Sequence, residues 1–174
     1  MGDPKKQRKK FSKPSHPWQK ERIDAEKGIL KQYGLRRKYE VWKMDSMLKK
    51  VLHRAKTIIG ERTSQSELEE KQLLGKLCLL GLLKKDSKVE DVLNLKLKDI
   101  LERRLQTLVC RKNMAKTMLQ ARQFITHECI VIGSKKITTP SYLVSIDEEP
   151  HIKLTRPIQL ISSQQEEKME KVKA

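Results

Sequence analysis

The stretch RRLQTLVCRKNMAKTMLQARQFI, residues 103–125, decides the fold because it keeps a helical apolar rhythm and holds six basic residues but no acidic one. A helix that only had to be soluble could use glutamate as freely as lysine. Asp99 and Glu102 predict where its first helix begins, and one side of that helix is apolar, formed by Leu101, Leu105, Leu108 and Val109. The basic flank of the same wheel is formed by Arg103, Arg104, Thr107 and Arg111.

A second helix is predicted after a turn at Asn113, a residue type that tolerates the left-handed backbone conformation. Thr117, with Gln120 three residues later, forms a capping box that opens this helix. Its apolar face is predicted to hold Met118, Ala121, Phe124 and Ile125. Because a helix N-terminus offers free amides and a positive dipole end, its position next to Lys112 and Lys116 makes a site suited to an anion.

Strands are expected after the second helix. The segment CIVIGSKKI predicts a hairpin that turns at Gly133 and Ser134, and the turn is followed by Lys135 and Lys136. The segment SYLVSI, residues 141–146, comes directly after a proline and is predicted to be a further strand. The predicted order is helix, helix, hairpin and strand, with basic residues on both helices and on the hairpin.

The charge of the whole chain points to a polyanionic partner. Its 174 residues include 39 Lys+Arg against 22 Asp+Glu, a formal net charge of +17. Residues 1–60 carry 18 basic and 6 acidic residues, residues 61–101 carry 8 of each, and residues 102–145 carry 8 and 2. Two basic blocks favour nucleic acid, with an anionic membrane or acidic proteins as the other candidates. No apolar run reaches the ~18–20 residues of a spanning helix and the start lacks the apolar region of a signal peptide, so we expect no membrane partner and a cytoplasmic protein.

Both ends of the chain are expected to lie outside the folded part. Residues 1–16, MGDPKKQRKKFSKPSH, are predicted to form a basic N-terminal arm that has almost nothing to bury and is disordered alone. We expect the arm to order against phosphates, with a solubilising tail as the alternative; its cations are Lys5, Lys6, Arg8, Lys9 and Lys10. Residues 159–174 have mixed charge and are predicted to be a mobile tail.

Residues 17–101 are predicted to form a helical subdomain. Its first helix begins at Pro17 and ends at Gly34, which suits a left-handed cap. The second helix ends at Gly60 and carries an apolar stripe at three-four spacing: Val41, Met44, Leu48, Val51, Leu52, Ala55, Ile58 and Ile59. Capping boxes beginning at Ser66 and Ser87 are expected to open the helical segments that follow.

The remaining side chains point to no catalytic chemistry. Three widely spaced cysteines in apolar runs predict buried thiols in a reducing compartment, not disulfides: Cys78, Cys110 and Cys129. The triplet HEC, residues 127–129, lacks the ligand spacing of a metal site. No Gly-rich phosphate motif or aspartate cluster occurs. Trp18 and Trp42 are predicted to pack in the core or between helices, with base stacking as the less favoured alternative. We expect no metal, cofactor, small-molecule substrate or enzymatic activity.

The segment ILERRLQTLVCRKNMAKTMLQARQFITHECIVIGSKKITTPSYLV resembles the RNA-binding module named after small-subunit ribosomal protein S-four. The start MGDPKK, the HPW triplet, the turn in QYGLRRKYEVWK and the LLGLL before the module are similar too, so the resemblance reaches about residue 155. The chain resembles the archaeal form of the S-four family. Together with the residue patterns, this implies an α+β fold: a basic arm (1–16), a helical subdomain (17–101), a helix-helix-β-hairpin RNA-binding module (102–158) and a mobile tail (159–174).

The resemblance also implies a function. Members of the family bind small-subunit ribosomal RNA early, nucleate assembly of the subunit body, support translational accuracy and have protein neighbours near the messenger entry side. Carried over by position, the implied RNA contacts on the module are Arg103, Arg104, Arg111, Lys116, Thr117, Gln120, Arg122 and Lys135. Four neighbouring cations join this candidate set: Arg36, Arg37, Lys112 and Lys136.

The sequence departs from the family pattern at a few positions. Family members often have glycine where Asn113 stands, proline and lysine where Met118 and Leu119 stand, and a small residue where Glu128 stands. We expect Leu119 to lose one phosphate partner and Glu128 to place a negative charge near the RNA. The alternatives are a free-standing RNA-binding stress or rescue factor and an RNA-modifying enzyme with the same module, while a protein-interaction scaffold fits a charge of +17 less well.

Overall fold

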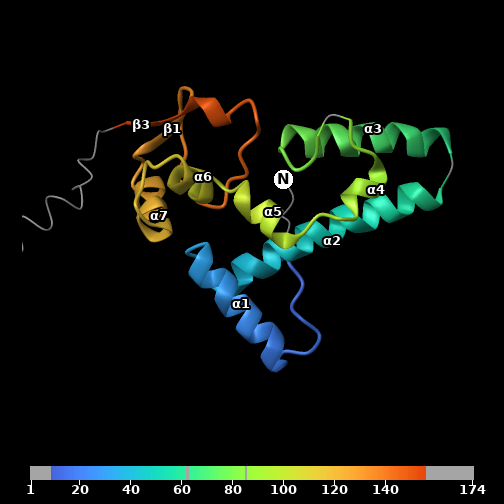
Figure 1. Ribbon diagram of the computed structural model, residues 1–174, viewed down its shortest axis with the longest axis horizontal. Coiled ribbons are helices and arrows are strands. Elements are labelled where there is room, and N and C mark those ends of the chain that lie inside the picture. The colour runs from blue at the N-terminus through green and yellow to red at the C-terminus, as the bar shows by residue number, and fades with distance from the viewer. Residues whose placement is uncertain (1–8, 62, 85, 156–174) are drawn as a thin grey trace, which may run out of the picture.

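The computed structural model describes residues 9–61, 63–84 and 86–155. Figure 1 shows two lobes, one of long helices and one in which two helices cover a small sheet. The helical lobe contains α1 (Lys20–Gln32), α2 (Lys38–Gly60), α3 (Ser64–Leu79) and α4 (Val89–Val92). The second lobe contains α6 (Leu105–Arg111), α7 (Met118–Thr126), β1 (Ile130–Ile132), β2 (Lys135–Lys136), a 3-10 turn (Glu149–His151) and β3 (Ile152–Leu154). Between the lobes lies α5 (Leu97–Glu102).

The three strands form one antiparallel sheet in the order β2-β1-β3. Ile132 of β1 pairs with Lys135 of β2 across the predicted turn, where Gly133 has a φ of 60°. The hairpin and the α+β class are therefore confirmed. The prediction of a strand at residues 141–146 is wrong, because the strand on the other side of β1 is Ile152–Leu154.

The predicted helix that starts near Asp99 is interrupted at Arg103 and Arg104. α5 ends before these residues and α6 begins after them. Leu105 N donates to Tyr142 O at 2.8 Å, and Val144 N donates to Arg103 O at 3.0 Å. The interrupted helix and the absent strand at residues 141–146 have the same cause. Residues 142–144 form backbone hydrogen bonds with the junction between α5 and α6 instead of with the sheet.

Buried apolar side chains form three clusters along the molecule. The cluster of the second lobe includes Leu105, Leu108, Val109, Ala121, Phe124, Ile125, Ile130 and Val144. A second cluster joins α1, α2 and α5 through Tyr33, Leu35, Val41, Met44, Leu48, Ile100 and Leu101. A third joins α2, α3 and α4 through Ala55, Ile58, Leu73, Leu77, Val89 and Val92. α2 serves two clusters, as its long stripe predicted, although Ile59 is 45% exposed. The domain boundary at residues 101 and 102 stays a prediction.

The predicted end of α1 is confirmed, but its predicted start is wrong. Gly34 has a φ of 57° and Leu35 N donates to Leu30 O at 3.0 Å, which is the expected cap. The helix begins at Lys20, three residues after Pro17.

The predicted capping boxes of the next two helical segments are displaced. At α3 the cap is Thr63, whose hydroxyl accepts from Ser66 N at 3.2 Å, so Ser66 is the reciprocal partner and not the cap. At α4 the carboxylate of Asp91 accepts from Lys88 N at 2.9 Å, and Ser87 is not the cap. In both cases a neighbouring residue offers the same type of oxygen at the required distance along the chain.

The N-terminal arm has more contacts than predicted. Residues 9–16 contain no helix or strand, but Phe11 is half-buried and its ring centroid lies 6.1 Å from those of Tyr39 and Trp42. Ser12 N donates to Ser46 Oγ at 3.0 Å. The prediction that the arm buries almost nothing is therefore wrong for this part of it. Residues 1–8 and the predicted tail lie outside the described residues.

The two tryptophans differ. Trp42 is half-buried, as predicted, and its Nε1 donates to Glu26 Oε1 at 3.0 Å. The prediction for Trp18 is wrong, because this side chain is 90% exposed. The segment before α1 holds it away from both lobes' apolar clusters.

The cysteines are less buried than the sequence predicted. All three are free thiols and half-buried. No helix in the described part of the chain combines the length and apolarity that crossing a bilayer requires. Within these same residues, no three His, Cys, Asp or Glu side chains gather closely enough to hold a metal ion.

Candidate nucleic-acid interface

The turn between α6 and α7 is held by local hydrogen bonds. Asn113 has a φ of 57°, which confirms the predicted left-handed turn. Thr117 caps α7, and its hydroxyl accepts from Gln120 N at 3.2 Å. The amide oxygen of Gln120 accepts from Lys116 N at 2.8 Å, one residue before the position that a full capping box requires. The loop that carries Lys112 and Lys116 is thereby fixed at both ends.

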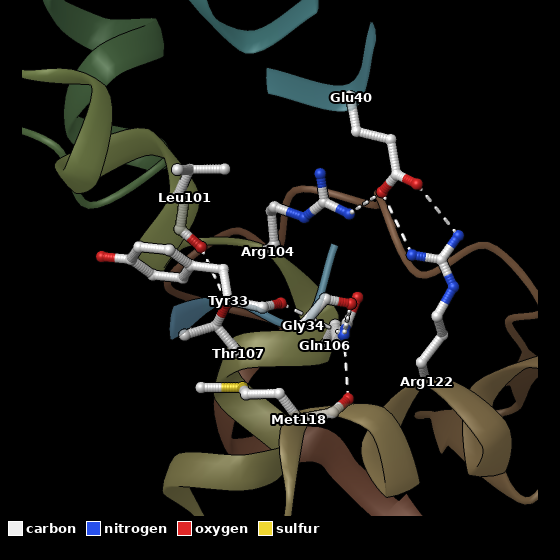
Figure 2. A network of polar contacts seen from close by, with 9 residues as sticks. All are labelled: Tyr33, Gly34, Glu40, Leu101, Arg104, Gln106, Thr107, Met118 and Arg122. Carbon is white, nitrogen blue, oxygen red and sulfur yellow. Dashed lines mark hydrogen bonds and ion pairs between the residues drawn. The ribbon is translucent and has the colours of Figure 1, made fainter. Parts of the chain in front are cut away.

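A buried glutamine ties this turn to the helical lobe. Gln106 is 1% exposed, and its Nε2 donates to three carbonyl oxygens, those of Met118 at 2.8 Å, Gly34 at 3.1 Å and Tyr33 at 3.3 Å. Figure 2 shows its amide between Gly34 and the first residue of α7. A Cβ on Gly34 would lie 2.7 Å from the Met118 Cβ, so only glycine permits this approach. The exposed Arg36 and Arg37 follow Gly34 on the same loop and therefore lie on the α7 side of the helical lobe.

A carboxylate in α2 is shared by two arginines of the second lobe. Glu40 Oε2 lies 3.3 Å from Arg104 Nη2 and 3.1 Å from Arg122 Nη1, and its Oε1 accepts from Arg122 Nη2 at 3.1 Å. Figure 2 shows the carboxylate facing both guanidinium groups. Burial alone raises the pKa of the Glu40 carboxyl, but hydrogen bonds and charge from Arg122 and Arg104 outweigh burial and hold that pKa below its ordinary value. Glu40 is therefore ionised at neutral pH and binds the two lobes together.

Arg104 is buried in the structure, whereas the sequence placed it on the exposed basic flank. It is 1% exposed, because the break between α5 and α6 turns it inward. Its Nε and Nη1 are buried and have no hydrogen-bond partner among the described residues. The helical wheel placed Arg104 beside Arg111 only because it assumed one continuous helix. Thr107 is likewise buried, and its hydroxyl donates to Leu101 O at 2.8 Å.

Three more side chains that were predicted to contact RNA point partly into the protein. The Arg103 guanidinium donates to Glu149 Oε2 at 2.8 Å and to Val144 O at 3.1 Å, and Lys112 Nζ donates to Glu149 O. The side chain of Arg103 is 15% exposed and that of Arg122 is 20% exposed. These residues hold the polypeptide that surrounds the interface, and they offer a ligand only part of their surface.

The other predicted residues in the described part of the chain reach solvent. Arg111 is paired with Glu102 at 2.7 Å, but both side chains are largely exposed. Lys136 Nζ lies 3.8 Å from Glu128 Oε2, so the negative charge expected beside the interface has a cation next to it. Exposed without exception are Lys9, Lys10, Arg36, Arg37, Lys116, Thr117, Lys135 and Lys136, while Gln120 is half-buried. Lys5, Lys6 and Arg8 lie outside the described residues.

Sequence reasoning missed the two residues that organise this surface, Glu40 and Gln106. A signal was present for the first: Glu40 is the only acid among residues 28–44, which include five basic residues. Gln106 gives no such signal, since a glutamine on a helix is ordinarily a surface residue.

The chain is similar in sequence to known proteins. Residues 103–149 match the family model of the S4 domain. A small ribosomal subunit protein uS4 from Saccharolobus solfataricus is 49% identical over 150 residues, which cover 86% of this chain and 83% of that protein. The chain belongs to the uS4 family. Two uS4 proteins from strains of Saccharolobus islandicus are 48% identical over the same shares of both chains.

Family membership confirms the resemblance that the sequence suggested, including its archaeal form. In this uS4-family chain the S4 domain begins at Arg103, where α5 and α6 separate. The domain includes α6, α7 and the hairpin, together with the segment that pairs with the helix junction. Its exposed cations and those of the loop before α2 form one candidate interface that spans both lobes.

Proposed function

We propose that this chain is a structural constituent of the small ribosomal subunit and binds small-subunit ribosomal RNA. The observation that carries the proposal is the 49% identity, over most of the chain, to proteins named small ribosomal subunit protein uS4. The S4 domain at residues 103–149 supports the same function. The stress-factor and RNA-modifying alternatives are not favoured, because the relatives named above are all small-subunit proteins. The role needs no catalysis.

The RNA-facing surface in this proposal is the set of exposed cationic and polar residues together with the half-buried Gln120. It consists of Arg36, Arg37, Arg111, Lys116, Thr117, Gln120, Lys135 and Lys136, with Lys9 and Lys10 beside α2. Lysine and arginine release counterions from RNA phosphates, which gives an affinity that falls steeply with salt. Helical RNA hides its base edges in a deep, narrow groove, so recognition of backbone shape and ribose hydroxyls is expected to dominate. Arg103, Arg104 and Arg122 support this surface from inside.

We further propose a place for the protein within the subunit. It binds the RNA early, nucleates assembly of the body and supports translational accuracy, with protein neighbours near the messenger entry side in the cytoplasmic subunit. One feature supports early binding. The lobes are held together by buried contacts of the chain itself, through Glu40 and Gln106. A protein that is folded before it meets RNA can recognise a junction without another subunit protein.

The proposal is tested with the full chain and with the small- and large-subunit ribosomal RNAs of Saccharolobus solfataricus. We expect tighter binding to the small-subunit RNA and footprints clustered at one multi-helix junction. Replacing Arg111, Lys135 and Lys136 by alanine is expected to weaken binding and to reduce the salt slope by about one per lost phosphate contact. Replacing the exposed Lys71, Lys84 and Lys98 by alanine removes the same charge from outside the S4 domain and is the matched control.

Two results would contradict the proposal. One is equal affinity for the two ribosomal RNAs, which would make the chain a general polyanion binder. The other is an equal loss of affinity in the two triple variants, which would mean that net charge alone, and not the S4-domain surface, binds the RNA.

A further inference from the structure

Trp18 is the most exposed aromatic side chain of the molecule. It is 90% exposed, whereas the next most exposed aromatic, Tyr39, is 42% exposed and stacks on Phe11. Aromatic residues make up only 4% of the chain. Burial of a tryptophan ring raises the equilibrium constant for folding by several hundredfold or more. An exposed tryptophan does not provide this stabilisation. Such a side chain, in a protein with few aromatics, calls for a ligand that covers it.

The backbone next to Trp18 is held in place. Arg22 Nη2 donates to both His16 O and Pro17 O at 3.0 Å. The same guanidinium pairs through Nη1 with the buried carboxylate of Glu26. That carboxylate also accepts from Trp42 Nε1 at 3.0 Å, which ties the assembly to α2. The residues before Trp18 are thus anchored to two helices, so the exposed ring projects from a defined position.

The surroundings of Trp18 are cationic. Residues 9–20 include four lysines and a histidine and no acidic residue. All four lysines are exposed, and none forms an ion pair within the described part of the chain: Lys9, Lys10, Lys13 and Lys20. A segment with free positive charge on both sides of an exposed aromatic ring is complementary to a polyanion that also carries flat apolar groups. RNA is such a ligand, whereas an apolar pocket of a protein neighbour would not need the lysines.

We infer that Trp18 is a stacking platform for an unpaired base of the bound RNA, with the lysines of residues 9–20 on the adjoining phosphates. The inference rests on the proposed function and adds a contact that the S4-domain surface lacks. Stacking accepts any base, because every base has a π-face. Trp18 therefore selects an unstacked nucleotide at a fixed place, and the cations of the S4 domain recognise the helical backbone around it.

The affinity experiment compares two replacements of Trp18 in the full chain on the small-subunit ribosomal RNA of Saccharolobus solfataricus. Trp18→Leu keeps an apolar side chain without a π-face and is expected to weaken binding by about 5- to 150-fold with an unchanged salt slope. Trp18→Phe is expected to stay within about threefold of the wild type, because a phenyl ring still stacks. Leu68→Ala, which removes a 55% exposed apolar side chain from α3, is the control and should bind normally.

A spectroscopic experiment reports stacking itself. Because the chain has two tryptophans, Trp42→Phe leaves Trp18 as the only one. Its emission is expected to be quenched by the ribosomal RNA and unchanged by inorganic polyphosphate, which has the charge of RNA but no bases. Melting curves of the Trp18 variants should match those of their parents, since the ring is exposed.

Each failure has a separate meaning. Wild-type affinity of Trp18→Leu, or equal quenching by polyphosphate and RNA, overturns the stacking platform while the proposed function stands. Normal RNA binding by Trp18→Leu together with poor incorporation into reconstituted small subunits also overturns it, because a protein neighbour then covers the ring. A wild-type chain with no preference for small-subunit RNA defeats the proposed function instead.

Discussion

Arg104 and Arg111 have different roles, and the partner of each decides which role it has. Arg104 is 1% exposed and faces Glu40, whereas the Arg111 side chain is 53% exposed and its partner Glu102 is 40% exposed. A buried ion is stable only while its partner is present, and an exposed pair contributes little. Residue type alone therefore does not separate structural arginines from those that remain available to a ligand.

Arg104→Ala is expected to reduce the stability of the fold, and Arg111→Ala is expected to weaken RNA binding. Arg104→Ala should lower the free energy of unfolding by about 3–5 kcal/mol, because it leaves the buried Glu40 with one partner. Arg111→Ala should change it by less than about 1 kcal/mol and should reduce the salt slope of RNA binding by about one. Urea unfolding and filter binding measure the two quantities. Wild-type stability of Arg104→Ala combined with weak RNA binding would mean that Arg104 faces the RNA after all.

Glu40 makes part of the stability dependent on pH. Its pKa is lower in the folded state, so its contribution is complete above the unfolded pKa of about 4.3 and is lost as pH falls through the folded value. Glu40→Gln is expected to lower the free energy of unfolding by about 3 kcal/mol at neutral pH, and the difference from wild type should shrink below about pH 4.

Urea unfolding over a pH series checks this prediction. Asp86→Asn, which changes an exposed acid outside the described ion pairs, should run parallel to the wild type at every pH. A Glu40→Gln deficit that persists unchanged in acid would show that the carboxylate's charge is not what stabilises the lobe contact.

The burial of Arg104 could not be predicted from its neighbours in the sequence. Glu40 lies 64 residues away from it, and the break between α5 and α6 depends on backbone hydrogen bonds with residues 142–144. Trp18 is the opposite case, since its apolar character suggested burial and nothing local indicated that the chain would hold it outside. Asn113 and Thr117 were predictable, because the turn and cap they make are completed within a few residues.

At the scale of elements, local sequence signals again predicted the structure, and contacts between distant segments were again missed. The apolar periods of α2 and α7 and the turn at Gly133 are local signals, and each produced the predicted element. The segment at residues 141–146 has the composition of a strand, but the edge of β1 is occupied by Ile152–Leu154. Strand propensity describes a fit to a pleated surface and does not say which segment reaches that surface.

The corner between α1 and α2 depends on Gly34 in two ways, and a second glycine separates them. Gly34 and Gly133 have similar φ values, 57° and 60°, but only at Gly34 does an added Cβ meet a neighbour, Met118 Cβ at 2.7 Å. Gly133→Ala should cost about 1–2 kcal/mol of backbone strain. Gly34→Ala should cost at least about 2 kcal/mol more, because α7 must move or Gln106 must lose its carbonyl partners.

Urea unfolding of the two variants gives this difference directly. The hydrogen-exchange rates of the first turn of α7 should rise in Gly34→Ala and stay unchanged in Gly133→Ala. Equal costs for the two substitutions would mean that the contact between the α1–α2 corner and α7 contributes nothing beyond backbone strain.

At the scale of the whole molecule, the two lobes meet through few buried polar groups while the surface carries a large excess of one charge. Like charges repel in the free protein, and they attract RNA in the complex. The family and the α+β class were predictable from the sequence, because they rest on motifs. The arrangement of the lobes was not, since it depends on Glu40 and Gln106, each with partners more than sixty residues away.

Salt is therefore expected to act in opposite directions on the free protein and on its complex. Raising potassium chloride from about 0.1 M to about 1 M shortens the Debye length from ~10 Å to ~3 Å, which screens the self-repulsion of a chain with a net charge of +17. The melting temperature of the free protein should rise by roughly 2–4 °C for each kcal/mol of repulsion removed. The buried ion pairs of Glu40 are screened much less and should not offset this gain in melting temperature.

Over the same range of salt concentration the affinity for ribosomal RNA should fall by orders of magnitude. Calorimetry and filter binding on one sample series measure both, and a melting temperature that falls with salt would show that surface ion pairs outweigh the excess positive charge.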